Sequence, residues 1–200
     1  MKSALDVHRE LLARGVAHEI VRLRTPALSA DDLPEALDVP RGSCVAVRCY
    51  CVTRRNGRSV MVAVLVRAGD TPHPTSLLLA LDATGLRPAN AGEINEGTDY
   101  AAGLVSPLCL PSGMPLLADA ALGADGDGSD AVYAAVGESG VALAIHLHDL
   151  LVAADAQVTS LTAQPLSELD RLGWDGLDDR RERPAASVRL LTGRRPRRTG

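Results

Sequence analysis

The sequence predicts a mixed α+β fold in which helices pack against a sheet or barrel containing two hairpins. Residues 44–53 and 59–67 are rich in strand-forming side chains, and between them stands Arg55-Asn-Gly-Arg58, a strong hairpin turn signal. Residues 59–67 are apolar almost throughout, which predicts a central, buried strand. Residues 132–136 and 141–147 predict a second hairpin. Because strands and helices do not alternate as strict βαβ units, a mixed sheet or barrel is favoured over a doubly wound fold.

Helices are predicted where apolar residues recur at helical spacing behind a capping residue. Residues 3–14 place Leu5, Leu11 and Leu12 on one side and end at Gly15. Ser29 is suited to begin the second helix, which runs to about residue 38, because its hydroxyl can accept a hydrogen bond from a free N–H group. Further helices are expected at 75–81, 90–96 and 149–154, and further strands at 18–23 and 115–118.

Charge and composition limit how this chain could bind nucleic acid. It has 200 residues, of which 46% are hydrophobic, but it lacks Phe and has one Trp and three Tyr, so little aromatic surface is available for base stacking. The net charge is −7 over residues 1–162 and +3 over residues 163–200. Any contact with an RNA backbone must therefore be local or come from the basic end.

Composition also divides the chain and suggests its compartment. We assign residues 1–162 to one domain and residues 163–200 to a charged, apolar-poor tail of the kind that is typically disordered. No apolar run is long enough to span a membrane, and the first residues lack the apolar block of a signal peptide. We expect a cytoplasmic protein without contact with a membrane.

Metal ligands are poorly represented in the sequence. The four cysteines contain no C-x-x-C pair and are distant in sequence from His146 and His148, which favours free thiols over a zinc site. The acidic turn at residues 124–129 is spaced like a calcium loop but lacks the downstream Glu. We expect neither a metal nor an organic cofactor. His146 and His148, two residues apart on the last strand or its end, are either surface or capping residues or, for one of them, a proton-transfer group.

Residues 99–111 have no helical period and combine several features of a ligand-binding loop. Ser106 precedes Pro107, which forces Ser106 into an extended conformation, and Gly103 can adopt backbone angles closed to other residues. Such a loop could present backbone N–H groups to a ligand while Ser106 points at it. On local sequence alone, a simple connector between two elements is the more economical interpretation.

In their order and spacing, these segments resemble the YbaK and prolyl-tRNA-synthetase-associated editing domain family over residues 4–162. The similar segments are an opening helix, glycine and strand at 7–19, a second helix at 29–37, residues 86–94, the loop Gly103-Leu-Val-Ser-Pro107 as the family's G-x-x-S/T-P motif, and the hairpin at 132–140 followed by Asp149-Leu-Leu. The resemblance implies a mixed, partly closed β-barrel flanked by helices.

The resemblance also implies a function, the hydrolysis of misacylated tRNA. Family members remove a small amino acid, typically cysteine or alanine, from proline tRNA, because one binding pocket separates similar apolar groups by only ~1–3 kcal/mol. The implied partner is the aminoacyl-adenosine at the tRNA 3′ end, and a prolyl-tRNA synthetase could be a second. One alternative is a catalytically impaired family member that acts as a tRNA-binding or regulatory module. Another is a hydrolase that acts on a different small aminoacyl ester or thioester.

Carried over to this chain, the family mechanism relies on the backbone of the glycine loop. The N–H groups of Gly103, Leu104 and Val105 would polarise the ester carbonyl as an oxyanion-type stabiliser, assisted by the substrate's ribose hydroxyl. Pro107 would fix the loop. Ser106 would hydrogen-bond the substrate's amino group or ribose, since no G-x-S-x-G elbow surrounds it that would make it a nucleophile.

The chain departs from the family pattern at the strand over residues 44–53. The family lysine, which contacts the terminal phosphate or ribose, would fall at about Val45 or Ala46, and Lys2 is the only lysine. Arg48 lies two residues beyond Ala46, hence on the same strand face. It either binds phosphate in place of the lysine or is a solvent-facing charge, and arginine and lysine are not equivalent at such a site.

Two residues beside the loop have alternative roles. Cys109 stands where the family has a glycine, and it either narrows the substrate pocket or is a structural thiol. Tyr100 either lines the acyl pocket or closes the core.

Overall fold

The structure is a computed structural model that describes residues 1–123 and 131–161. The chain divides into two units, Met1–Ala163 and Gln164–Gly200, and all described residues belong to the first. The predicted acidic turn at 124–129 and the predicted tail at 163–200 lie outside the described residues. No helix in the described part is long and apolar enough to cross a membrane.

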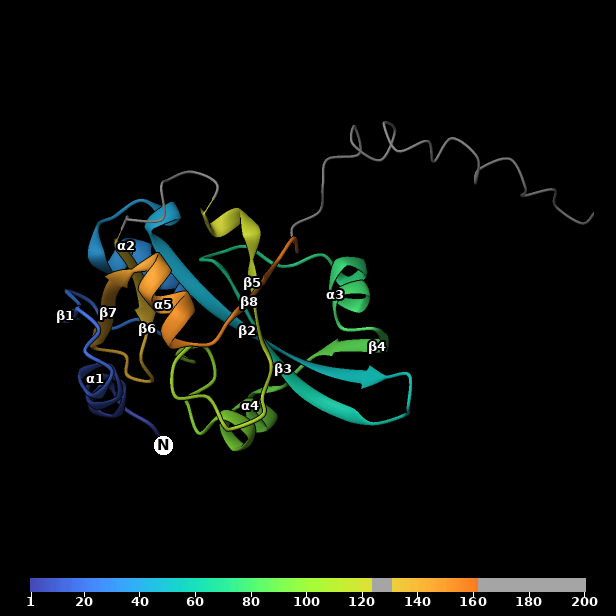
Figure 1. The fold of residues 1–200 in the computed structure, drawn as a ribbon. Helices are drawn as coiled ribbons and strands as arrows, with labels where there is room; N and C mark the ends of the chain where they lie inside the picture. Colours follow the sequence, from blue (N-terminus) through green and yellow to red (C-terminus); the bar gives the residue numbers. More distant parts are fainter. Residues whose placement is uncertain (124–130, 162–200) are drawn as a thin grey trace, which may run out of the picture. The chain divides into compact units, whose positions relative to one another are not determined.

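Helices and strands alternate irregularly along the chain, as predicted (Figure 1). The helices are α1 (Ala4–Ala13), α2 (Leu33–Leu37), α3 (Pro74–Ala80), α4 (Ala91–Thr98) and α5 (Leu147–Ala153), with short 3₁₀ helices η1 (Ala30–Asp32), η2 (Arg41–Ser43) and η3 (Ala120–Gly123). The strands are β1 (His18–Arg22), β2 (Cys44–Arg54), β3 (Ser59–Arg67), β4 (Ala83–Pro88), β5 (Leu116–Asp119), β6 (Ala131–Ala135), β7 (Val141–His146) and β8 (Gln157–Thr159).

The strands form one mixed sheet in the order β1-β7-β6-β2-β3-β5-β8, with β4 attached to β2. Both predicted hairpins, β2–β3 and β6–β7, are antiparallel, whereas β2–β6, β3–β5 and β5–β8 are parallel. The mixed α+β class is therefore confirmed. The end strands β1 and β8 are not joined to each other by hydrogen bonds within the described residues, so the sheet is not a hydrogen-bonded closed barrel.

Strand β2 is the strand around which the sheet branches. Along one edge it pairs with β3 over its length, which makes β3 a central strand as predicted. Along the other edge, Cys44 and Val45 pair with β6, and residues 50–54 pair with β4. Within the described residues, no strand pairs with residues 46–49 on that edge. Of the two positions at which the lysine is expected, Ala46 lies in this gap and Val45 pairs with β6.

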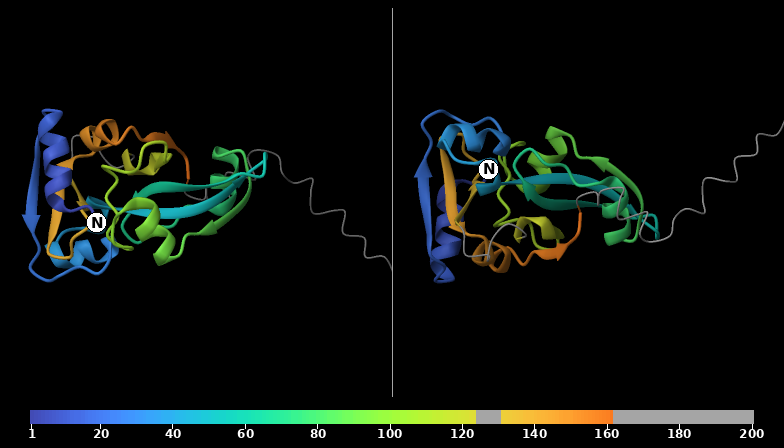
Figure 2. Two further views of the ribbon diagram at one scale, coloured as in Figure 1. Left: turned by 90° about the horizontal axis from the view of Figure 1, so that it is seen from below. Right: turned by 90° about the horizontal axis from the view of Figure 1, so that it is seen from above.

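Helices cover both faces of the sheet and separate its core into clusters. Val7 and Leu11 of α1 and Leu150 of α5 pack with one face of β6–β7, and α2 covers the other. Alternation along the β2–β3 hairpin places α3 on one side, with Leu77 in the cluster of Val62 and Val64, and α4 on the other (Figure 2).

Candidate functional site

The Gly103 loop has a conformation that requires glycine. Gly103 has φ +89°, in the left-handed region, and a Cβ atom there would lie 2.8 Å from the carbonyl oxygen of Leu28. Its own carbonyl accepts a hydrogen bond from the Ala30 N–H at 2.8 Å. The loop is thus held closely against the start of η1, and a side chain at this position would force the two segments apart.

The three predicted amide donors differ in their hydrogen bonds and in their exposure, since Gly103 is exposed whereas Val105 is only 3% exposed. The Leu104 N–H donates to Ala101 O at 3.0 Å, and Leu104 O accepts from the Gly137 N–H at 2.9 Å. The N–H groups of Gly103 and Val105 have no acceptor within residues 1–123 and 131–161. Since an unsatisfied N–H in a packed loop is costly, these two groups are suited to donate to a ligand oxygen.

Ser106 is fully buried, with 0% of its surface exposed. Its Oγ accepts a hydrogen bond from the Leu108 N–H at 3.3 Å, so the hydroxyl turns back on its own loop. Pro107, which follows it, is also buried. In this conformation the structure does not bring the Ser106 hydroxyl to a surface where substrate could reach it.

Tyr100 closes the core behind the loop. The residue is fully buried, and its hydroxyl donates to Leu108 O at 2.9 Å. Burial raises the pKa of Tyr100 well above its ordinary value, so the phenol remains a neutral donor. Of its two predicted roles, the structure supports the core-closing one.

Cys109, at the position where the resemblance leads us to expect glycine, has a left-handed backbone conformation with φ +54°. Cysteine thus adopts a backbone conformation here that favours glycine. The Cys109 Sγ lies 3.9 Å from Asp6 O, and burial raises the pKa of this half-buried thiol. None of the four cysteines forms a disulfide bond.

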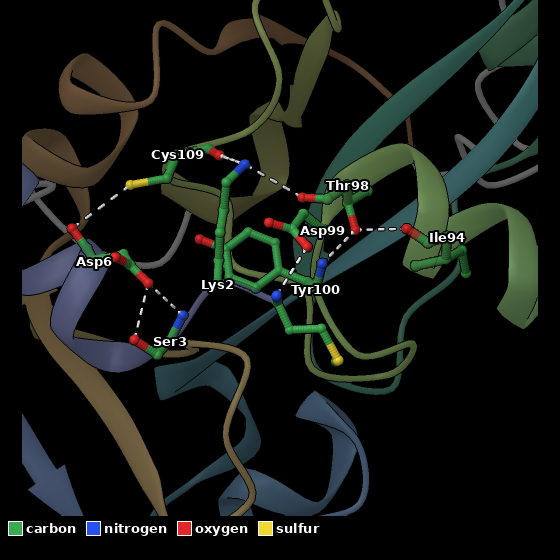
Figure 3. Close-up of polar contacts among 9 residues, drawn as sticks. Lys2, Ser3, Asp6, Ile94, Thr98, Asp99, Tyr100 and Cys109 are labelled. Atoms are coloured by element: carbon green, nitrogen blue, oxygen red, sulfur yellow. Dashed lines mark hydrogen bonds and ion pairs between the residues drawn. The ribbon is translucent and has the colours of Figure 1, made fainter.

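The one lysine of the chain contacts this loop, which sequence reasoning did not anticipate (Figure 3). The Lys2 ammonium donates to Cys109 O and, at 3.3 Å, to Thr98 O. It also lies 5.5 Å from the centroid of the Tyr100 ring, a cation–π distance. The contacting residues are about 100 positions away in sequence, so no local signal could have identified them.

The strand face that would carry the family lysine is apolar and closed. Val45 and Ala46 are each 1% exposed and belong to clusters on opposite faces of β2. Ala46 shares its cluster with Leu104 of the loop and with Ala30 of η1. The structure therefore brings Ala46 and the glycine loop together, but without a cation between them.

Arg48 points to the same side and is engaged with Asp31. Its Nη2 lies 2.6 Å from Asp31 Oδ1, and its Nε donates to Asp70 O at 3.2 Å. Asp31 Oδ1 also accepts from the Gly69 N–H at 2.6 Å. Desolvation raises the pKa of Asp31, but the hydrogen bonds from Arg48 and Gly69 outweigh it, and the net shift is downward. Through η1, the Arg48 site adjoins the Gly103 loop.

The remaining predicted features lie elsewhere. His146 is the last residue of β7 and the N-cap of α5, and His148 lies within α5; both are exposed, and they do not share one strand face. A cavity of about 390 Å³ is lined in part by Pro107, Cys109 and Met114, on the α1–α5 side of the loop. A larger cavity of about 670 Å³ lies between the β2–β3 hairpin and α4 and contains none of the predicted site residues.

The profile of the aminoacyl-tRNA editing domain matches residues 25–153. The chain belongs to the aminoacyl-tRNA editing domain family. The matched range contains the glycine loop, η1 and β2, so these elements form the candidate site of an editing domain. A comparison with curated proteins finds no match.

Solved structures agree with this assignment at the level of the fold. The hypothetical protein APE2540 is 22% identical, with a TM-score of 0.67, over 78% of this chain and 97% of its own. A candidate trans-editing enzyme for prolyl-tRNA synthetase is 23% identical, with a TM-score of 0.67, over 80% of this chain and 97% of its own. A candidate signal transduction protein from Marinobacter aquaeolei VT8 is 16% identical, with a TM-score of 0.53, over 80% of this chain and 31% of its own.

Proposed function

We propose that this editing domain is a cytoplasmic trans-editing deacylase, which hydrolyses the ester of a small amino acid such as cysteine or alanine on proline tRNA. The observation that carries the proposal is the Gly103 loop, whose Gly103 and Val105 N–H groups have no acceptor in the described part of the chain. Such groups can bind the carbonyl oxygen of an ester and stabilise the negative charge that develops when water attacks it.

The proposed mechanism uses the backbone rather than a side-chain nucleophile. Gly103 and Val105 would donate to the ester oxygen, while Leu104 N–H is already bound within the loop. Ser106 is buried and acts on the loop itself, so it has no part in covalent chemistry. Water is then the nucleophile, and the substrate's ribose hydroxyl assists its attack.

Arg48 is the proposed contact for the terminal phosphate or ribose. It adjoins the loop through η1, and its guanidinium already binds a carboxylate oxygen of Asp31, a geometry that also suits phosphate. To bind a phosphate, Arg48 must share or exchange its Asp31 partner. Anchoring by Arg48 is therefore weaker than anchoring by an unpaired lysine.

One observation favours a second function, tRNA binding without hydrolysis. Ala46 is closed inside an apolar cluster, and Arg48 is paired with an acid, so the strand offers no unpaired cation at this point. A member of the family that is impaired in this way would still present the loop to the 3′ end.

The purified protein, incubated with cysteinyl-, alanyl- and seryl-tRNA species, decides between the two. If the protein is a deacylase, it should release cysteine or alanine from proline tRNA at a rate well above the rate in buffer. Binding of the same tRNAs, measured separately by filter retention, gives the second readout. Binding without accelerated hydrolysis of any species would replace the deacylase by the tRNA-binding function, and neither activity would remove both.

A further inference from the structure

Lys2 joins the two ends of the loop that carries the proposed site. The loop leaves α4 at Thr98 and turns at Cys109, and the Lys2 ammonium donates to the carbonyl of each (Figure 3). The backbone of the same residue adds a third contact, because the Lys2 N–H donates to Asp99 O at 2.7 Å. Lys2, near the N-terminus, thus links the beginning of the segment 98–109 to its end.

Tyr100 completes this arrangement from beneath. Its hydroxyl holds Leu108 O at 2.9 Å, and its ring lies 5.5 Å from the Lys2 ammonium. The carbonyls of residues 108 and 109 are therefore held by Tyr100 and Lys2, respectively. Because these two carbonyls directly follow Ser106 and Pro107, their orientation fixes how the chain leaves the proposed site.

The loop needs such support, since it has one unfavourable backbone conformation and two N–H groups without an acceptor in the described residues. Cys109 has φ +54°, a region that non-glycine residues rarely adopt. The N–H groups of Gly103 and Val105 have no acceptor in the described residues, and a free loop would move to satisfy them. A cation that holds both ends of the loop opposes that movement.

We infer that Lys2 is a positioning residue for deacylation: it holds residues 98–109 in the conformation that keeps the Gly103 and Val105 N–H groups free for the substrate. This inference rests on the proposed function of the loop. Lys2 would not touch the ester, since it contacts Thr98, Asp99 and Cys109 rather than Gly103 or Val105. The ammonium supplies three donors from one compact head, whereas the planar guanidinium of arginine cannot direct the same donors at Thr98 O, Cys109 O and the ring face together.

The test compares Lys2→Met and Lys2→Arg with Arg24→Met. Arg24 is 80% exposed and lies 3.9 Å from Asp38, so its replacement removes one cation without touching the loop. We expect Lys2→Met to lower kcat roughly ten- to hundredfold, because small displacements of catalytic groups have such effects. KM should stay within about twofold, since ground-state binding is made elsewhere. Lys2→Arg should recover only part of kcat, and Arg24→Met should match the wild type.

Hydrogen exchange followed by mass spectrometry supplies a readout that does not depend on catalysis. In Lys2→Met, amides of residues 98–109 should exchange faster than in the wild type, while those of the β2–β3 hairpin should not change. Unchanged exchange in the loop, or an equal increase throughout the protein, would overturn the inference. So would a kcat equal to that of Arg24→Met. If the wild type hydrolyses no tRNA, the proposed function fails, and loop exchange alone decides whether Lys2 positions the loop.

Discussion

The Gly103 loop and the adjacent face of β2 differ in what each could contribute to the proposed editing site. The loop depends on its backbone: Gly103 and Cys109 adopt left-handed conformations, and the Gly103 and Val105 N–H groups remain without acceptors in the described part of the chain. On the β2 face, Ala46 stands at a position where the proposed phosphate anchor would need a lysine side chain, and it is buried in an apolar cluster.

In the proposed site, a donor built from the backbone is expected to depend less on residue identity than an anchor built from a side chain. Substitutions leave the N–H groups in place as long as the chain keeps its conformation, and Cys109 shows that a residue other than glycine can hold a left-handed φ in this loop. A single substitution removes a lysine completely. Polarisation of the ester and anchoring of the phosphate can therefore be lost separately.

Restoring the expected lysine, by Ala46→Lys, tests whether the β2 face is truly closed. We expect the free energy of unfolding to fall by about 3 kcal/mol or more, because an ammonium would be buried without a partner at a site that is 1% exposed. Urea unfolding measures this. Arg48→Lys is the matched control, since it places a lysine two residues along, where a cation is already accommodated. Loss of less than about 1 kcal/mol in Ala46→Lys would mean that this face can open to admit a lysine.

The Gly103 loop, the other region of the comparison, is tested by Gly103→Ala, with Gly113→Ala as its control. Both glycines have positive φ, +89° and +84°, but only at Gly103 would the added Cβ meet another atom, Leu28 O at 2.8 Å. We expect Gly113→Ala to cost about 1 kcal/mol for the backbone alone, and Gly103→Ala to cost about 2–4 kcal/mol.

Deacylation should separate these two variants more sharply than stability does. Gly103→Ala should lose turnover, because the loop must move away from η1, whereas Gly113→Ala should retain it. Turnover in Gly103→Ala at the rate of the Gly113→Ala control would show that the close approach of loop and η1 is not needed for catalysis.

Sequence reasoning found the elements whose signals are local. Three features can be predicted from a few consecutive residues, and the structure has all three: the hairpin turn at 55–58, the cap at Ser29 and the irregular loop around Gly103. Strand β4 was missed because its six residues include Gly85 and Pro88, which are depleted in strands, and β8 because it has only three residues.

The contacts that complete the site were not predictable in this way. Lys2 meets its carbonyl partners across 96 and 107 positions, and Arg48 meets Asp31 across 17. Spacing placed Arg48 on the correct strand face but could not identify its partner. Nor could it show that the Ser106 hydroxyl turns inward, since that depends on how the loop folds back on Leu108.

The smallest expected effect concerns the pairing of Arg48 with Asp31. The pKa of Asp31 lies below its ordinary value of 3.8, since the hydrogen bonds from Arg48 and from Gly69 N–H outweigh desolvation. A carboxyl with a lowered folded-state pKa adds stability above its unfolded pKa and loses it as the pH falls through the folded value. Because the Arg48 and Asp31 side chains are 25% and 36% exposed, we expect the pair to contribute only about 0.5–1 kcal/mol to the free energy of unfolding.

Urea unfolding of the wild type and Asp31→Asn, at pH 7 and at successive values below pH 4, measures this contribution. The difference between the two proteins should be present at pH 7 and should vanish at the acid end, where the wild-type carboxyl is protonated. A difference that does not change with pH would mean that Asp31 acts by packing rather than by charge, and Arg48 would then be unpaired in energetic terms. In that case Arg48 would be as available to phosphate as a lysine, and the contrast between the loop and the β2 face would narrow to Ala46 alone.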